Sequence, residues 1–166
     1  MSIDDPTRIT IEDCARRSHA GDLDFASVVA TLAAVGVESY HVDYRVGDST
    51  YYLPSGAAHA VALDLVGPPI AAEFAADAVQ DAVRGAQRGE VKYPEFVRRT
   101  RAAGCVGYCV WISGRHVVYF GRRGETNMPA CGTAMPASGA PVKLPATVPV
   151  GLSGSGISRI ASVRCK

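Results

Sequence analysis

Three residues of this sequence carry the side chains that a thiol-based catalytic site needs. Cys109 is a candidate nucleophile, His41 a candidate base and Asp43 a candidate group to orient that base. His41 aligns with Cys109 when the chain is slid by 68 residues, and Asp43 lies two residues from His41, on the same face of a strand. The alternative is a buried apolar Cys109 beside a solvated His41 and Asp43, and we favour this second interpretation. No motif names a reaction, so enzymatic activity stays open.

Metal, cofactor and phosphate chemistry have weaker signals. The four histidines form no HxH, HxxxH or HExxH pattern, so we expect neither a metal site nor a cofactor. The segment "GRRGET" makes Arg122 and Arg123 candidates for an anion contact. However, this segment lacks the lysine and the following helix of a phosphate-binding loop. We therefore favour a strand end followed by a turn, with both arginines in solvent.

The composition is that of a globular protein: 166 residues, 48% hydrophobic and 20% charged, with a net charge of +1. All charged residues after residue 126 are basic, so the rest of the chain is mildly acidic, which argues against a nucleic-acid binder. No apolar run is long enough for a membrane helix. The five cysteines form no CxxC pair, and we predict free thiols in the cytoplasm.

An internal repeat organises the chain. Residues 21–56 align without a gap with residues 89–124. The identities fall on glycines and on aromatic or small apolar residues: Gly21/Gly89, Val29/Val97, Ala34/Ala102, Gly36/Gly104, Tyr40/Tyr108, Val42/Val110, Tyr51/Tyr119 and Gly56/Gly124. We interpret this pattern as an internal duplication.

Each half predicts two helices followed by a β-hairpin. The halves cover about 9–56 and 70–124, and together they form one α+β domain over residues 1–126. The expected fold is a mostly antiparallel four-stranded sheet with the helices on one face. Residues 127–166 are rich in Pro, Gly, Ser and Ala and lack aromatic residues. We expect them to be a disordered or non-native tail.

The alternation of side chains sorts each hairpin into two faces. A first turn centred on Val46 and Gly47 would place Val42 opposite Tyr51 on the core face. The outer face of the second hairpin is apolar, which predicts that something covers it. We favour a homodimer contact, with cover by the same chain or a small-molecule ligand as alternatives. The expected interface residues are Tyr52, Cys109, Trp111, Val118 and Phe120.

The segments "LAAVGVESYHVDYRVGDSTYYLPSG" and "YPEFVRRTRAAGCVGYCVWISGRHVVYFGRRGE" resemble the YbcV-like family over about 9–126. That resemblance implies a small bacterial protein of unknown function, sometimes associated with prophages. It supports the predicted fold but implies no catalytic residues. The sequence thus favours a homodimeric binding or assembly module. The alternatives are a small-molecule binder or enzyme with Cys109, His41 and Asp43 in a pocket between the halves, and a phage-derived structural or host-modulating protein.

Overall fold

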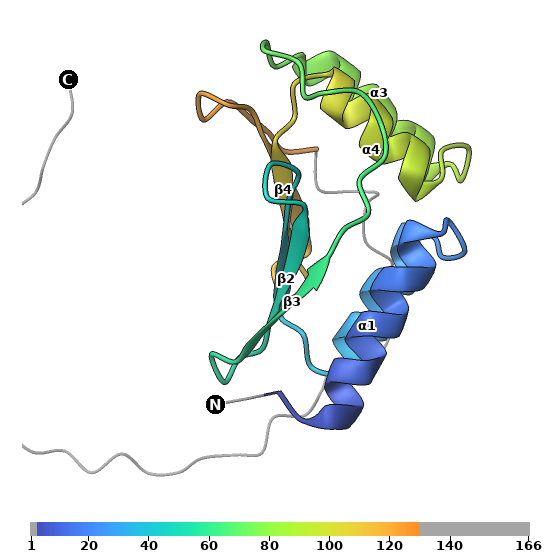
Figure 1. The fold of residues 1–166 in the computed structure, drawn as a ribbon, viewed down its shortest axis with the longest axis vertical. Coiled ribbons are helices and arrows are strands. Elements are labelled where there is room, and N and C mark those ends of the chain that lie inside the picture. The colour runs from blue at the N-terminus through green and yellow to red at the C-terminus, as the bar shows by residue number, and fades with distance from the viewer. Residues whose placement is uncertain (1–2, 130–166) are drawn as a thin grey trace, which may run out of the picture.

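A computed structural model describes residues 3–129, which form one sheet with helices on a single face (Figure 1). The helices are α1 (Asp5–His19), α2 (Phe25–Ala34), α3 (Ala76–Gln87) and α4 (Tyr93–Ala102). The strands are β1 (Ser39–Asp43), β2 (Asp48–Tyr52), β3 (Ala58–Ala62), β4 (Gly107–Trp111), β5 (His116–Phe120) and β6 (Thr126–Asn127). The α+β class and the antiparallel sheet are confirmed.

The sheet has six strands in the order β3-β2-β1-β4-β5-β6, so the prediction of four strands was wrong. The strand β3 has the sequence AHAVA, whose alanines give it little of the β-branched character that marks a strand. It forms because it pairs along the full length of β2, with Val61 opposite Ser49. The strand β6 has two residues and pairs with β5.

The two halves of the chain have corresponding elements. The bounds of α2, β1 and β2 return 68 residues later as those of α4, β4 and β5. The central ladder joins β1 to β4, and His41 lies opposite Cys109, its own counterpart at that offset. The sheet order and this register together describe an approximate twofold relation between the halves. An origin by duplication stays a prediction.

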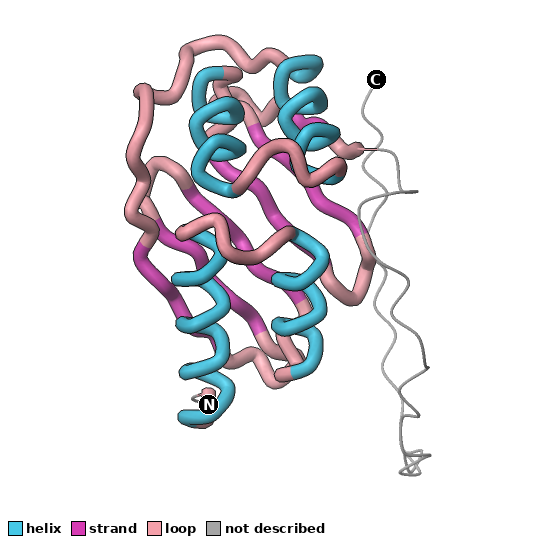
Figure 2. Tube along the Cα trace, turned by 90° about the vertical axis from the view of Figure 1, so that its right-hand side faces the viewer, coloured by secondary structure: helices cyan, strands magenta, loops and turns pink. Residues whose placement is uncertain are grey.

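The helices form two hairpins, α1 with α2 and α3 with α4, which lie side by side on the same face of the sheet (Figure 2). The strands turn Tyr40, Val42, Tyr108 and Val110 toward these helices, and all four are buried. Alternation then places the residues between them, such as His41 and Cys109, on the opposite, open face. This separation decides which candidate residues can meet.

The helices α2 and α4 end before corresponding glycines in left-handed conformations. Gly36 has φ +80° and Gly104 has φ +79°. A Cβ at Gly36 would have open space around it, whereas a Cβ at Gly104 would clash with the backbone carbonyl of Glu73. The segment before α3 therefore packs directly on Gly104. Among residues 3–129, no helix has the length and apolarity that crossing a membrane requires.

Candidate functional site

The predicted catalytic residues lie together on the open face of the sheet. His41 on β1 pairs with Cys109 on β4, and Asp43 follows two residues along β1. The rings of His41 and Phe120 lie edge to face, with their centroids 6.3 Å apart. The sequence therefore brought these residues to one face, although not into a pocket.

The bonds made by these side chains do not activate the thiol. The carboxylate of Asp43 accepts hydrogen bonds from Arg45, at 2.6 Å from Nη2 and 3.0 Å from Nε, and from the Arg45 backbone N–H at 2.8 Å. These bonds lower the pKa of Asp43 and engage its carboxylate in the turn, and within residues 3–129 no hydrogen bond joins it to His41. Burial raises the pKa of the Cys109 thiol, which disfavours the nucleophilic thiolate.

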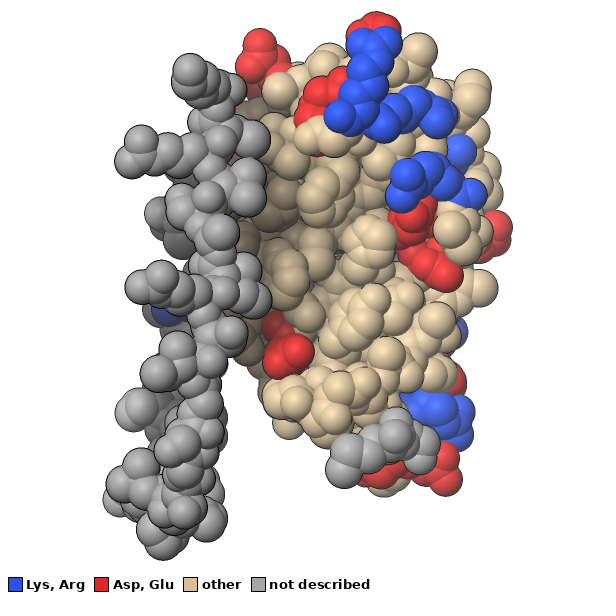
Figure 3. Space-filling model, turned by 90° about the vertical axis from the view of Figure 1, so that its left-hand side faces the viewer, with Lys and Arg blue, Asp and Glu red and all other residues tan. Residues whose placement is uncertain are grey.

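The remaining residues of the predicted interface share this open face. Trp111 is 44% exposed and Tyr52 is 37% exposed, while Val118 and Phe120 are half-buried. The ring of Trp111 stacks against His116 with the centroids 6.1 Å apart. Figure 3 shows a face made largely of uncharged residues, with charged side chains gathered mainly toward its edges.

Arg122 and Arg123 follow β5, where a turn was expected. The guanidinium of Arg123 binds both carboxylate oxygens of Glu73, at 2.9 and 3.2 Å, and Arg122 Nη2 reaches the Ile70 carbonyl at 3.4 Å. Both side chains thus contact the segment before α3. The pairing with Glu73 offsets the charge of Arg123 but not that of Arg122.

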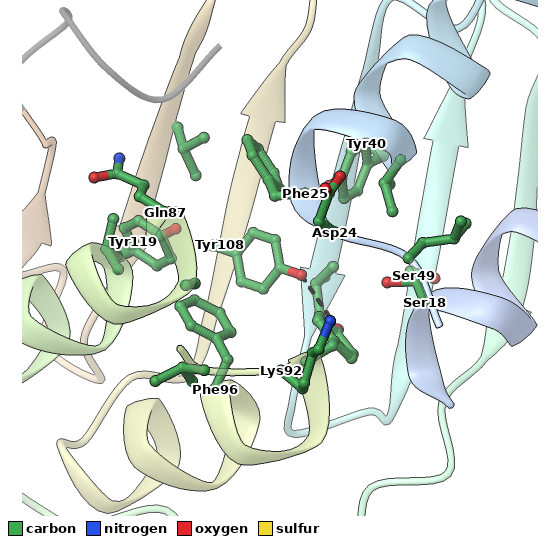
Figure 4. A pocket seen from close by; sticks show the side chains of 18 of the residues that line it. Ser18, Asp24, Phe25, Tyr40, Ser49, Gln87, Lys92, Phe96, Tyr108 and Tyr119 are labelled. Carbon is green, nitrogen blue, oxygen red and sulfur yellow. Dashed lines mark hydrogen bonds between the residues drawn. The ribbon is translucent and has the colours of Figure 1, made fainter. Parts of the chain in front are cut away.

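A cavity of about 520 Å³ lies on the other side of the sheet, between the strands and the two helix hairpins (Figure 4). None of Cys109, His41 and Asp43 lines it. A volume of this size is within the range of small-molecule sites. Corresponding residues of both halves form its aromatic and apolar lining: Phe25 and Tyr93, Val28 and Phe96, Tyr40 and Tyr108, and Tyr51 and Tyr119.

Tyrosine rings form the floor of this cavity. Tyr40 stacks on Tyr51 with centroids 5.4 Å apart, and Tyr108 lies 5.5 Å from Tyr119. Tyr40 and Tyr108 join the two pairs edge to face at 6.4 Å. Neighbouring strands thus present a continuous row of rings, to which a flat apolar molecule can add its own contacts.

Two hydroxyls on this floor have no partner within the described part of the chain. The Tyr108 hydroxyl donates to the Tyr93 hydroxyl at 3.2 Å, and the Ser49 hydroxyl donates to that of Tyr51 at 3.1 Å. Tyr40 and Tyr119 are only 4% and 5% exposed, yet neither hydroxyl makes such a bond. Burial raises the pKa of both phenols, so they stay protonated and can donate to a ligand.

Three charged side chains of the described chain line the cavity: Asp24, Lys92 and Arg115. Asp24 precedes α2 and Lys92 precedes α4, both are exposed, and they correspond at the offset of 68 residues. Figure 4 shows Asp24 and Lys92 on the sides of the two different helix hairpins, with Tyr108 behind them. At the ends of α1 and α3, His19 corresponds to Gln87, and His19 stacks on Tyr93 at 5.3 Å.

Sequence reasoning missed this cavity because it assigned the tyrosines to the core. One signal was present in the repeat: a carboxylate at position 24 faces an ammonium at position 92. No three His, Cys, Asp or Glu side chains gather as a metal site would require within residues 3–129.

A comparison with protein families finds a match that spans most of the described α+β domain. Residues 16–127 match the model of the family described as "Protein of unknown function (DUF1398)", which covers both halves of the described domain. A comparison with curated proteins finds no match. The match covers more than half of the sequence and stops where the described strands stop, at β6. The chain belongs to the DUF1398 family.

Proposed function

We propose that this protein binds a small, largely apolar molecule in the cavity between the sheet and the helices. The observation that carries the proposal is the cavity itself: about 520 Å³, floored by tyrosine rings, with two phenol hydroxyls that bond to no described residue. An open cleft of this size with a mainly apolar and aromatic lining is typical of small-molecule sites. Burial of apolar ligand surface would supply the affinity.

The test uses N-phenylnaphthylamine, a neutral dye whose fluorescence rises in an apolar site. We expect saturable binding to the full-length protein. The variant Ala86→Trp should abolish it, because Ala86 is half-buried and lines the cavity, so an indole there fills the space. The control is Ala78→Trp, which places the same side chain on the exposed side of the same helix. Equal binding by both variants and wild type would overturn the proposal.

We also propose self-association through the open sheet face, because Trp111 and Tyr52 are exposed there on a largely uncharged surface. An exposed apolar patch can form an isologous contact with the same patch of a second copy. Trp111→Lys should convert a dimer to a monomer in size-exclusion chromatography with light scattering. Val66→Lys, at a residue 79% exposed in the segment between β3 and α3, is the control. A wild type that stays monomeric at high concentration would exclude this role.

The two proposals concern opposite faces of the sheet and do not depend on each other. Dye binding that survives Trp111→Lys but not Ala86→Trp would locate the ligand in the cavity. A cytoplasmic location, a prophage association and a structural or host-modulating role stay predictions from the sequence.

A further inference from the structure

The mouth of the cavity has opposite charges at two equivalent positions. Asp24 and Lys92 are each the residue that precedes an α-helix of ten residues. Their backbones have nearly the same conformation, with φ −82° and ψ 166° for Asp24, and φ −80° and ψ 162° for Lys92. Any difference between them therefore lies in the side chains.

Helix stability explains Asp24 but not Lys92. The Asp24 carboxylate accepts a hydrogen bond of 2.7 Å from the backbone N–H of Ser27, as a good N-cap does. Lys92 makes no capping bond, and a cation is disfavoured at the positive end of a helix. Within residues 3–129, no carboxylate lies within ion-pair distance of Lys92, although the Ser27 hydrogen bond and, less strongly, the charge of Lys92 lower the pKa of Asp24 across the mouth. Capping therefore does not account for a lysine at this position.

The cavity beside Lys92 supplies a second, independent sign of a ligand. Tyr40 and Tyr119 line the cavity and are more than nine-tenths buried as residues, and their hydroxyls bond to no residue of the described chain. A ligand in the cavity can supply the partner that these hydroxyls lack. The rings around them can sandwich or edge-pack a flat body, and the hydroxyls can donate to acceptor atoms on it.

We propose that the natural ligand is a small aromatic acid. Its planar body lies among the tyrosine rings, and its single carboxylate meets the Lys92 ammonium and the free backbone N–H groups at the start of α4. Asp24 keeps the opposite side of the mouth negative and so sets the direction in which the acid enters. This inference rests on the proposed binding function and adds the charge and orientation of the ligand.

The experiment compares two dyes that share one body: neutral N-phenylnaphthylamine and anionic anilinonaphthalene sulfonate. Wild type should bind the sulfonate more tightly than the neutral dye. Lys92→Ser should weaken sulfonate binding about tenfold and leave the neutral dye within about twofold. The same substitution creates the capping box Ser-Tyr-Pro-Glu before α4, and it should raise the thermal midpoint by a few degrees. Weaker binding by a more stable protein cannot come from misfolding.

Three further variants complete the design. Lys92→Arg keeps the charge and should retain sulfonate binding. Asp24→Asn keeps a capping side chain but removes the negative charge, and it should tighten sulfonate binding about twofold. Arg84→Ser removes one positive charge from an exposed site that does not line the cavity, and it should change neither dye.

The two proposals fail in different ways. If neither dye binds, or if Ala86→Trp leaves both unaffected, the cavity is not a binding site and both proposals are wrong. If the neutral dye binds in the cavity but Lys92→Ser weakens both dyes equally or neither, the ligand is not an acid and only the present inference is overturned.

Discussion

Comparing the corresponding glycines Gly36 and Gly104 measures how tightly the segment before α3 packs on the end of α4. Each takes a φ near +80° at the end of a helix, where alanine costs about 1–2 kcal/mol because its Cβ approaches the following carbonyl oxygen. The unfolded chain loses the same freedom in both variants. Gly36→Ala, with open space around its Cβ, should therefore destabilise the protein by about 1 kcal/mol.

Gly104→Ala adds a steric term to this conformational one. Its Cβ would overlap the Glu73 carbonyl oxygen and lie 3.0 Å from the Cα of Phe74. This segment has little room to move, because the Ala71 and Ala75 backbone N–H groups donate to the end of α4 at 3.0 and 2.8 Å. Overpacking against a held backbone costs about 1–3 kcal/mol, so we expect a total loss near 3 kcal/mol.

Urea unfolding followed by circular dichroism measures the loss of unfolding free energy in each variant, provided that the slope of this free energy against urea concentration stays the same. The informative quantity is the difference between the two variants, which we expect to be about 2 kcal/mol. A difference below about 0.5 kcal/mol would mean that the segment before α3 does not lie on Gly104, and it would refute the reasoning.

Three other predictions concern single side chains. Tyr44→Phe removes a buried hydrogen bond to Thr100 (3.1 Å) and should lower the free energy of unfolding in urea by about 1 kcal/mol. Its control, Tyr40→Phe, loses no bond to a described residue and should lower that free energy by less than about 0.5 kcal/mol. Burial lowers the pKa of His19 below the 6.5 of a free histidine. The part of the folding stability that depends on a neutral His19 is therefore present above about pH 6.5 and is lost as the pH falls toward the lowered pKa. His19→Gln should flatten this part of the profile of stability against pH, and an unchanged slope would contradict the assignment. Because burial raises its pKa, Cys109 should react with iodoacetamide more slowly than free cysteine at neutral pH, as peptide mass spectrometry can show; a faster reaction would restore the catalytic hypothesis.

The sequence predicted much of the fold because the hairpins alternate clearly. The first turn was placed one residue too late, so Val42 was expected opposite Tyr51, whereas Tyr40 lies there. The error moved the register by two residues, and an even shift leaves every side chain on its predicted face. The faces of the second hairpin likewise follow from the alternation from Tyr108 to Trp111.

The cavity was beyond what the sequence reasoning reached. A tyrosine that packs in a core and one that lines a cavity have the same place in an alternating strand, since the difference depends on how far apart the helices stand. The alanine-rich strand β3 was missed for a related reason, because it is stabilised by its neighbour β2 and not by its own propensity. The reversal of charge from Asp24 to Lys92, at matched helix starts, was the one feature of this cavity that could be read from the sequence.

The central pairing of β1 with β4 also determines when the cavity exists. These strands are separated by more than sixty residues of chain, so their contact closes the longest loop in the described sheet. Such long-range pairing slows folding. Neither half can complete the cavity floor before β1 pairs with β4, a pairing that forms the seam between the halves. A molecule bound above the seam would recognise only the fully assembled domain. It should therefore slow global unfolding and raise amide protection in both halves together, not only near its own contacts.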